Sequence, residues 1–300
     1  MDEEVFESDI VIIGHIARDI IEIDGVSKPV LGGAVYYGGL AGSRMGLKVA
    51  IITRLKVEDF PILESFEKHN IKYFAYPAKE TSGIKNIYSS QNMEYRSYEP
   101  LGFAGAFNKE EIPDIKTKIF VIGSIIAGEI DLELLKYLNE KYNGRLGLDI
   151  QGFIRGIKDS KMQYFSLTEK EKAEIISRVD YLKVDETEAK ILTNISSLPK
   201  AGKQLINLGP KEVLITHQRG INLTSRNKSY FFPWKNKGSV GRTGRGDTAF
   251  ISYLGSLITK SPEDSLRFSA ALTSLKMELI EPFSSPLSAV EKLIREEYIQ

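Results

Sequence analysis

The sequence has no cysteine among its 300 residues, and features that mark several other protein classes are also missing. Without cysteine there are no disulfides, thiolate metal sites or cysteine nucleophiles, which agrees with a reducing compartment, so a cytoplasmic protein is expected. No apolar run approaches the roughly 18 residues of a membrane helix. The first ten residues are acidic rather than basic, so no signal peptide is expected.

Charge of one sign is not in excess either. Forty basic and forty acidic residues give a formal net charge of zero, so no overall field attracts nucleic acid or an anionic membrane. Aromatic residues do not alternate with basic clusters, and the three histidines lack zinc-site spacing. We therefore expect a small solute as partner, and neither nucleic acid nor a membrane.

Short apolar runs alternate with helical stretches along most of the chain. The runs predict buried strands at 9–14, 48–53, 118–123, 145–150, 180–184 and 212–216. Helical spacing predicts helices between several of these strands and a closing helix over 286–298. This alternation predicts a single α/β domain over residues 1–300, with a doubly wound, mostly parallel sheet flanked by helices.

Two segments interrupt the alternation, at about 16–30 and 83–99. Both contain half-polar strands, and they predict a small antiparallel β lid over the carboxyl edge of the main sheet, where open α/β sheets bind ligands. The alternative is a pair of surface hairpins without a role in binding. Arg96 and Tyr98, in the second segment, either close over a substrate or are exposed strand residues.

Residues 241–248 read Gly-Arg-Thr-Gly-Arg-Gly-Asp-Thr, which is close to a phosphate-binding loop except that Asp247 replaces its lysine. A carboxylate beside a phosphate repels it by about 4 kcal/mol per charge pair at an effective dielectric of 20. Asp247 is therefore no phosphate ligand. It is either a helix cap or a general base that accepts a hydroxyl proton while neighbouring amides hold a phosphoryl group.

The same stretch resembles the D-T-x-G-A-G-D signature of the PfkB/ribokinase-like carbohydrate kinases. Further stretches resemble other motifs of that family in chain order: Gly32-Gly33 its diglycine, Asp185-Glu-Thr-Glu188 its N-x-x-E, and Thr216 to Gly220, more faintly, its nucleotide turn. The resemblance extends over essentially the whole chain and implies a ribokinase-like fold.

This resemblance implies that the γ-phosphoryl group of ATP, with Mg²⁺, is transferred to a hydroxyl of a small sugar, keto-sugar acid or inositol-like polyol. Asp247 would be the general base, and the amides of Gly244, Arg245 and Gly246 would form the anion hole. Glu188 would act on Mg²⁺ through water. Residues implied at the substrate are Asp19, Gly32, Gly33, Tyr37, Gln151, Arg155 and Arg96; those implied at the nucleotide are Thr216, Gly220, Arg242, Thr243, Asp185 and Glu188.

Several of these assignments have plainer alternatives. Asp19 can be a turn residue, Glu188 a solvated helix residue, and the diglycine a tight turn only. Gln151 and Arg155 can belong to a surface loop with an ordinary salt bridge.

The departures from the family pattern are informative. Gly241-Arg242 replaces the leading Asp-Thr, at the end of the loop that in many members helps to hold a monovalent cation, and we hypothesise that Arg242 replaces that cation. Arg245 replaces an alanine and either contacts phosphate or points outward. Tyr37 stands where many relatives place an asparagine, so a different substrate selectivity is expected. Asp185 and Gln218 weaken the match at the nucleotide.

Two alternative functions remain open at this point. One is a nucleoside kinase on the same fold, because a nucleoside also offers a ribose hydroxyl to Asp247. The other is a kinase-like sugar-binding or regulatory protein without turnover, which the departures would explain. The resemblance also leaves open a homodimer that forms through the lid.

Overall fold

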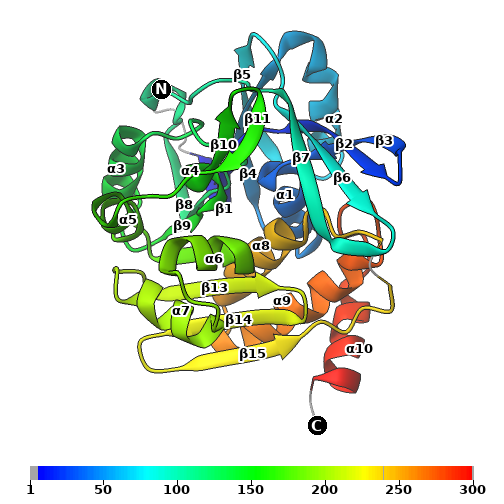
Figure 1. Ribbon diagram of the computed structural model, residues 1–300, viewed down its shortest axis with the longest axis vertical. Coiled ribbons are helices and arrows are strands. Elements are labelled where there is room, and N and C mark those ends of the chain that lie inside the picture. Colours follow the sequence, from blue (N-terminus) through cyan, green and yellow to red (C-terminus); the bar gives the residue numbers. More distant parts are fainter. Residues whose placement is uncertain (1–5, 239, 299–300) are drawn as a thin grey trace.

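The computed structural model describes residues 6–238 and 240–298, without the side chains of residues 92–96. Its main sheet is formed by β1 (Phe6–Ile13), β4 (Val49–Lys56), β5 (Lys72–Ala78), β8 (Ile115–Ile122), β9 (Leu146–Asp149), β12 (Tyr181–Asp185), β13 (Glu212–His217), β14 (Gly220–Ser225) and β15 (Ser229–Pro233). Within the described residues their order is β15-β14-β13-β12-β9-β8-β1-β4-β5 (Figure 1). The strands from β13 to β5 run parallel, and β14 and β15 are antiparallel. The predicted mostly parallel sheet is confirmed.

The apolar runs become strands that are buried on both faces. In β1, Val11 and Ile13 belong to one hydrophobic cluster, whereas Ile10 and Ile12 belong to another on the opposite face. Because successive side chains of a strand alternate between faces, a strand that is covered on both sides needs apolar residues at every position. That is why β1 reads as a continuous apolar run.

Helices cover both faces of the sheet. On one face lie α3 (Leu132–Lys141), α5 (Glu169–Ile176), α6 (Glu186–Thr193) and α7 (Leu198–Ile206). On the other lie α1 (Ala34–Arg44), α8 (Arg245–Leu257) and α9 (Pro262–Met277), with α10 (Leu287–Glu297) packed on α9. The short helical segments are η1 (Val57–Leu63), α2 (Glu64–Glu67), η2 (Lys109–Glu111) and α4 (Gln151–Ile154). No helix in residues 6–238 and 240–298 is long and apolar enough to span a bilayer.

The two interrupting segments pair in space, as predicted from the sequence. β2 (Ala17–Ile23), β3 (Val26–Gly32), β6 (Gly83–Ser89) and β7 (Asn92–Gly102) form a small sheet in the order β3-β2-β6-β7. The β2–β3 and β6–β7 pairs are antiparallel hairpins, and a parallel β2–β6 pair joins them. This small sheet, called the lid below, lies beside the main sheet in Figure 1. A further hairpin, β10 (Arg155–Lys158) and β11 (Lys161–Tyr164), follows α4.

Candidate active site

The turn that leads into α8 requires glycine at Gly244. This residue caps the helix with a φ of 79°, a left-handed conformation that side chains disfavour. A Cβ at Gly244 would also lie 2.3 Å from ring carbons of Tyr37, so there is no space for one. Tyr37 therefore packs directly against the backbone of the turn. The sequence motif thus encodes a helix start that is fixed by both backbone conformation and packing.

The first turn of α8 presents backbone donors as well as a carboxylate. The amide of Arg245 donates to the carbonyl of Arg242 at 3.1 Å. Within the described residues, the amides of Gly244 and Gly246 have no hydrogen-bond partner. Asp247 lies in the same turn, where the helix carries a partial positive charge. Two of the three amides predicted for the anion hole are therefore available, and that of Arg245 is engaged in the turn.

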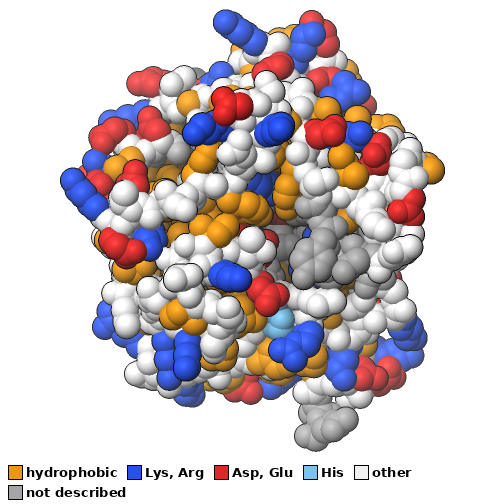
Figure 2. All heavy atoms as spheres, viewed as in Figure 1, with side chains coloured by type: hydrophobic (Ala, Val, Ile, Leu, Met, Phe, Trp, Pro, Cys, Tyr) orange, Lys and Arg blue, Asp and Glu red, His pale blue; other side chains and the backbone are white. Residues whose placement is uncertain are grey.

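A hollow of about 60 Å³ lies at this helix start, and most of the predicted loop and nucleotide residues line it. Its lining is Gln151, Lys183, Asp185, Thr216, Arg242, Gly244, Arg245, Gly246 and Asp247. Strands β9, β12 and β13 all end here, at the carboxyl edge of the parallel sheet. Figure 2 shows this face of the molecule hollowed between α6 and the lid. Residues far apart in sequence thus meet because parallel strands place their carboxyl ends together.

Lys183 carries a buried positive charge in this hollow. Its Nζ lies 2.9 Å from Asp149 Oδ2 and 3.8 Å from Glu188 Oε2, and all three side chains are buried. Burial alone lowers the pKa of Lys183, but nearby carboxylates, led by Asp149, outweigh it and raise the pKa above its ordinary value. A Cβ at Gly246 would lie 3.0 Å from Nζ. The ammonium is therefore charged and close to the candidate anion hole.

Asp185 and Glu188 form a reciprocal cap at the start of α6. Asp185 accepts from the amide of Glu188 at 2.8 Å, and Glu188 accepts from the amide of Asp185 at 2.6 Å. Burial raises the pKa of Glu188, and its Oε1 has no hydrogen-bond partner among the described atoms. Both residues therefore have a structural role, and one carboxylate oxygen of Glu188 remains available.

The fit of Mg²⁺ to this site depends on Glu188 Oε1. Groups of three or more acidic or histidine ligands are absent from the described residues. Mg²⁺ is commonly held by one or two carboxylates together with waters and substrate phosphates, rather than by a protein cage. Glu188 Oε1 is suited to such an arrangement through water. Among the described residues, Glu188 therefore fits a Mg²⁺ ion that the donor phosphates would bring.

Asp19 lies on the lid and is held in place there. Its side chain is 7% exposed, and Oδ1 accepts from the amide of Ile84 at 2.8 Å. A Cβ at Gly32 would lie 2.1 Å from Asp19 Oδ2, so glycine is needed there to make room. Gly33, with a φ of 94°, leads into α1, which carries Tyr37. The diglycine therefore both accommodates Asp19 and starts the helix that supports the Gly244 turn.

Gln151 and Arg155 converge on one carbonyl group. Arg155 Nη2 donates to the carbonyl of Ile125 at 2.9 Å, and Gln151 Nε2 lies 3.5 Å from the same oxygen. The guanidinium of Arg155 also lies 5.1 Å from the ring centre of Tyr98 on the lid. Arg155 is therefore buried between the main sheet and the lid. Arg96 lies on β7, but its side chain is outside the described residues.

The lid also contacts the loop before α8. Tyr88, on β6, places its hydroxyl 3.2 Å from Oγ1 of Thr243. Tyr88 is 4% exposed, and the contact itself is partly buried. The predicted lid and the predicted phosphate loop thus touch through two side chains.

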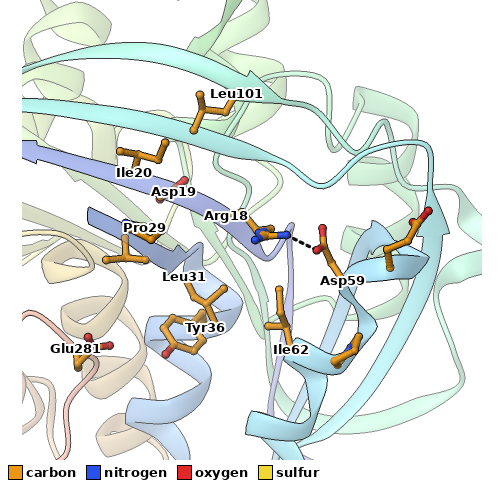
Figure 3. Close-up of a pocket in the computed structure, with 13 residues that line it drawn as sticks. Arg18, Asp19, Ile20, Pro29, Leu31, Tyr36, Asp59, Ile62, Leu101 and Glu281 are labelled. Carbon is orange, nitrogen blue, oxygen red and sulfur yellow. Dashed lines mark hydrogen bonds and ion pairs between the residues drawn. The ribbon is translucent and has the colours of Figure 1, made fainter. Parts of the chain in front are cut away.

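Two larger hollows adjoin these elements. One, of about 580 Å³, lies between the lid, η1 and α1, and Asp19 is among its lining residues. Figure 3 shows Arg18 of the lid pointing toward Asp59 of η1, with which it forms an ion pair of 2.5 Å. The other, of about 710 Å³, is lined in part by Glu186 and His217. These residues directly follow Asp185 and Thr216, so the second hollow adjoins the small one.

Comparison with known proteins finds kinases in both sequence and structure. No family model matches the chain. A cytidine kinase of Thermococcus kodakarensis is 28% identical over 255 residues, which cover 82% of this chain and 87% of that protein. A sulfate complex of a pyrophosphate-dependent kinase in the ribokinase family has a TM-score of 0.87 at 27% identity, covering 94% and 99% of the two chains. Arabidopsis thaliana ribokinase, with ribose and ATP, has the same fold, with a TM-score of 0.73 at 18% identity and coverage of 97% and 99%.

The chain has the ribokinase fold and is similar to kinases of the ribokinase family. Two lysines of this ribokinase-like protein were missed from its sequence as candidates. Lys183 interrupts an otherwise apolar strand two residues before Asp185, and a charge in a buried run was the available indication. Lys276 is completely buried near the end of α9 and had no comparable indication. Three of the residues predicted at the nucleotide do not line the small hollow: Glu188, Gly220 and Thr243.

Proposed function

We propose that the protein transfers a phosphoryl group to a hydroxyl of a small carbohydrate: a sugar, a keto-sugar acid or an inositol-like polyol. One observation carries this proposal. Asp247, the amides of Gly244 and Gly246, and the basic residues Lys183, Arg242 and Arg245 all border one small hollow. A base beside a set of converging donors suits proton removal from an alcohol together with stabilisation of a phosphoryl group.

In this proposal Asp247 accepts the proton of the acceptor hydroxyl as its oxygen bonds to phosphorus. The bond from phosphorus to the donor's bridging oxygen breaks, and that oxygen leaves with the donor. The amides of Gly244 and Gly246 stabilise the charge on the oxygens in transfer, and the nearby ammonium of Lys183 adds to this. Glu188 would hold a Mg²⁺ ion through water, and that ion would supply further charge neutralisation. The chain's contribution is mainly positioning and electrostatics.

ATP is the donor that the resemblance implies, and the adjoining hollow gives it room. That hollow contains His217 and Phe231, whose rings stack with centroids 5.6 Å apart. A base could lie there while the phosphates extend toward Thr216 and Gly244. Pyrophosphate is the second candidate. Three basic side chains border the small hollow, one of them where the family signature has alanine, and a relative at 27% identity is a pyrophosphate-dependent kinase.

The acceptor is placed between the lid and the main sheet. Asp19 supports this because the amide of Ile84 fixes its Oδ1 in the lid, and a carboxylate is a group that accepts hydrogen bonds from hydroxyls. A related pyrophosphate-dependent kinase, 26% identical, has been solved with myo-inositol, which agrees with a polyol. The similarity to a cytidine kinase keeps a nucleoside as the alternative acceptor.

A phosphorylation panel tests the proposal. Myo-inositol, several keto-sugars, sugar acids and cytidine would each be incubated with ATP or pyrophosphate, and the product detected by phosphorus NMR. Asp247→Asn should lower kcat by about 10²–10⁴-fold, the range for loss of a general base. Asp264→Asn, at the exposed start of α9, is the matched control and should keep the wild-type rate. Binding of an acceptor without transfer by the wild type would instead favour the sugar-binding protein.

A further inference from the structure

Lys276 is a buried lysine whose ammonium is surrounded by backbone carbonyl groups. It is 0% exposed, and its Nζ donates to the carbonyls of Gly241 at 2.6 Å and Thr243 at 2.5 Å. The carbonyl of Leu279 lies 3.4 Å away. In the part of the chain that the structure describes, this lysine has no ion-pair partner. A buried lysine without a carboxylate in ion-pair contact is unusual, because burial of a charge costs free energy that other contacts must offset.

The surroundings suit the charged form. An ammonium has three N–H donors for three carbonyl oxygens, whereas a neutral amine would turn its lone pair toward one of them. The Nζ also lies 4.9 Å from the ring centre of Tyr37, which attracts a cation. Burial lowers the pKa of Lys276 to about 7, while Asp247 and Glu281 favour the ammonium. Carbonyl dipoles, an aromatic face and nearby carboxylates thus all act on one cation.

This cation joins the loop before α8 to the end of α9. Gly241 donates its amide to the carbonyl of Met277 at 2.9 Å, and a Cβ at Gly241 would lie 1.6 Å from the carbonyl oxygen of Leu279. The loop is therefore pressed against α9 with its carbonyls turned inward. Such converging carbonyl oxygens repel one another unless a cation lies between them.

We propose that the ammonium of Lys276 is a tethered monovalent cation that holds the 241–244 loop in the shape in which the amides of Gly244 and Gly246 face the hollow. A protein without this lysine would need a bound ion such as potassium at the same carbonyls. The proposal rests on the proposed phosphoryl transfer at Asp247. In this proposal Lys276, and not Arg242, replaces the monovalent cation. Arg242 lines the hollow instead.

Removal and replacement of the cation test this proposal. Lys276→Ala should lower kcat by about tenfold or more, and KCl or NH₄Cl should restore part of the loss where choline chloride at equal ionic strength does not. Lys172→Ala is the matched control, because Lys172 is also buried and donates to a helix-end carbonyl, that of Leu192, at 2.8 Å, away from the hollow. Its rate should stay near that of the wild type and should not respond to potassium.

Thermal unfolding provides a readout that does not depend on turnover. Potassium should raise the Tm of Lys276→Ala more than choline does, because an ion that binds only the folded state stabilises it. If Lys276→Ala keeps the wild-type rate, or loses it with no recovery in any salt and no potassium-specific rise in Tm, the tethered-cation role is wrong. If potassium raises the rate of the wild type severalfold, the proposal is also wrong, because Lys276 should make a bound ion unnecessary. This result holds even if the variant does not fold. If the wild type transfers no phosphoryl group to any acceptor, the proposed function fails, and the Tm comparison still decides the cation site.

Discussion

The ammonium of Lys183 lies 2.9 Å from Asp149 Oδ2, and both side chains are buried at the carboxyl edge of the main sheet. Because Lys183 is on β12 and Asp149 ends β9, this ion pair ties neighbouring strand ends together directly below the first turn of α8. The same cation is 3.8 Å from Glu188. One positive charge thus offsets two buried carboxylates and also faces the place proposed for the phosphoryl group.

Replacing Lys183 should therefore be strongly destabilising. In Lys183→Met, Asp149 loses the buried partner of its ion pair, and the free energy of unfolding should fall by about 3–5 kcal/mol. Lys211→Met is the control, because Lys211 also lies 2.9 Å from its partner Asp180 but is 58% exposed. This substitution should lower the free energy of unfolding by less than about 1 kcal/mol. Urea denaturation measures both. Equal losses in the two variants would contradict the assigned role.

Gly244 offers a test of the helix start. Gly244→Ala places a methyl group against the ring of Tyr37 and forces a φ of 79° on alanine, so both stability and kcat should decrease. Gly46 has the same φ of 79° but no atom within 4 Å of an added Cβ, so Gly46→Ala measures the backbone effect alone, about 1–2 kcal/mol.

The comparison between these two variants separates conformation from packing. Thermal unfolding and rate measurements should show a larger Tm decrease for Gly244→Ala, and a lower rate in that variant only. If both alanine variants lose the same stability and neither loses activity, the contact between Tyr37 and the turn does not shape the site.

Much of this fold could be predicted because its physical causes are local. Strands covered on both faces must be apolar throughout, and a left-handed helix cap selects glycine, so β1 and the Gly244 turn leave a clear pattern in the sequence. The short antiparallel β14 and β15 and the β10–β11 hairpin were not predicted. Their patterns of four to six residues, as in Ser229–Pro233, do not distinguish a strand from a loop.

The two lysines show where prediction from sequence stops. Lys183 contacts Asp149, which is 34 residues away in sequence, and Lys276 contacts Gly241, which is 35 residues away. The partners of Lys276 are backbone carbonyls, which every residue has, so no residue pattern indicates them. Arg242 is a cation within the 241–248 motif itself. The fold, however, brings Lys276 of α9 to the carbonyls of that loop.

His15 predicts how stability depends on pH. It is completely buried, with Nδ1 2.7 Å from Oγ of Ser82, and burial lowers its pKa from 6.5 to about 3. Between these values the unfolded chain binds a proton that the folded chain does not. The contribution of His15 to stability should therefore be full above pH 6.5 and fall below it by about 1.4 kcal/mol per pH unit.

The variant His15→Gln isolates this effect from that of other acidic and basic groups. Urea denaturation at several pH values between 7.5 and 5 should give a smaller loss of stability on acidification in the variant than in the wild type. Parallel curves for the two proteins would show that His15 binds its proton equally well in the folded state.

The contact between Tyr88 and Thr243 joins the lid to the loop before α8, and we propose that the lid is part of the site. If the lid closes on an acceptor, hydrogen exchange of backbone amides in residues 84–98 should slow when the acceptor binds. Tyr88→Phe removes the hydroxyl that lies 3.2 Å from Thr243, so it should raise the KM for the acceptor severalfold with little change in the Tm. Tyr73→Phe, which removes a hydroxyl bonded to Glu67 at an exposed position, is the matched control and should leave the KM unchanged. Unchanged exchange on binding, together with equal KM values in the two variants, would show that these strands are the surface hairpins considered as the alternative.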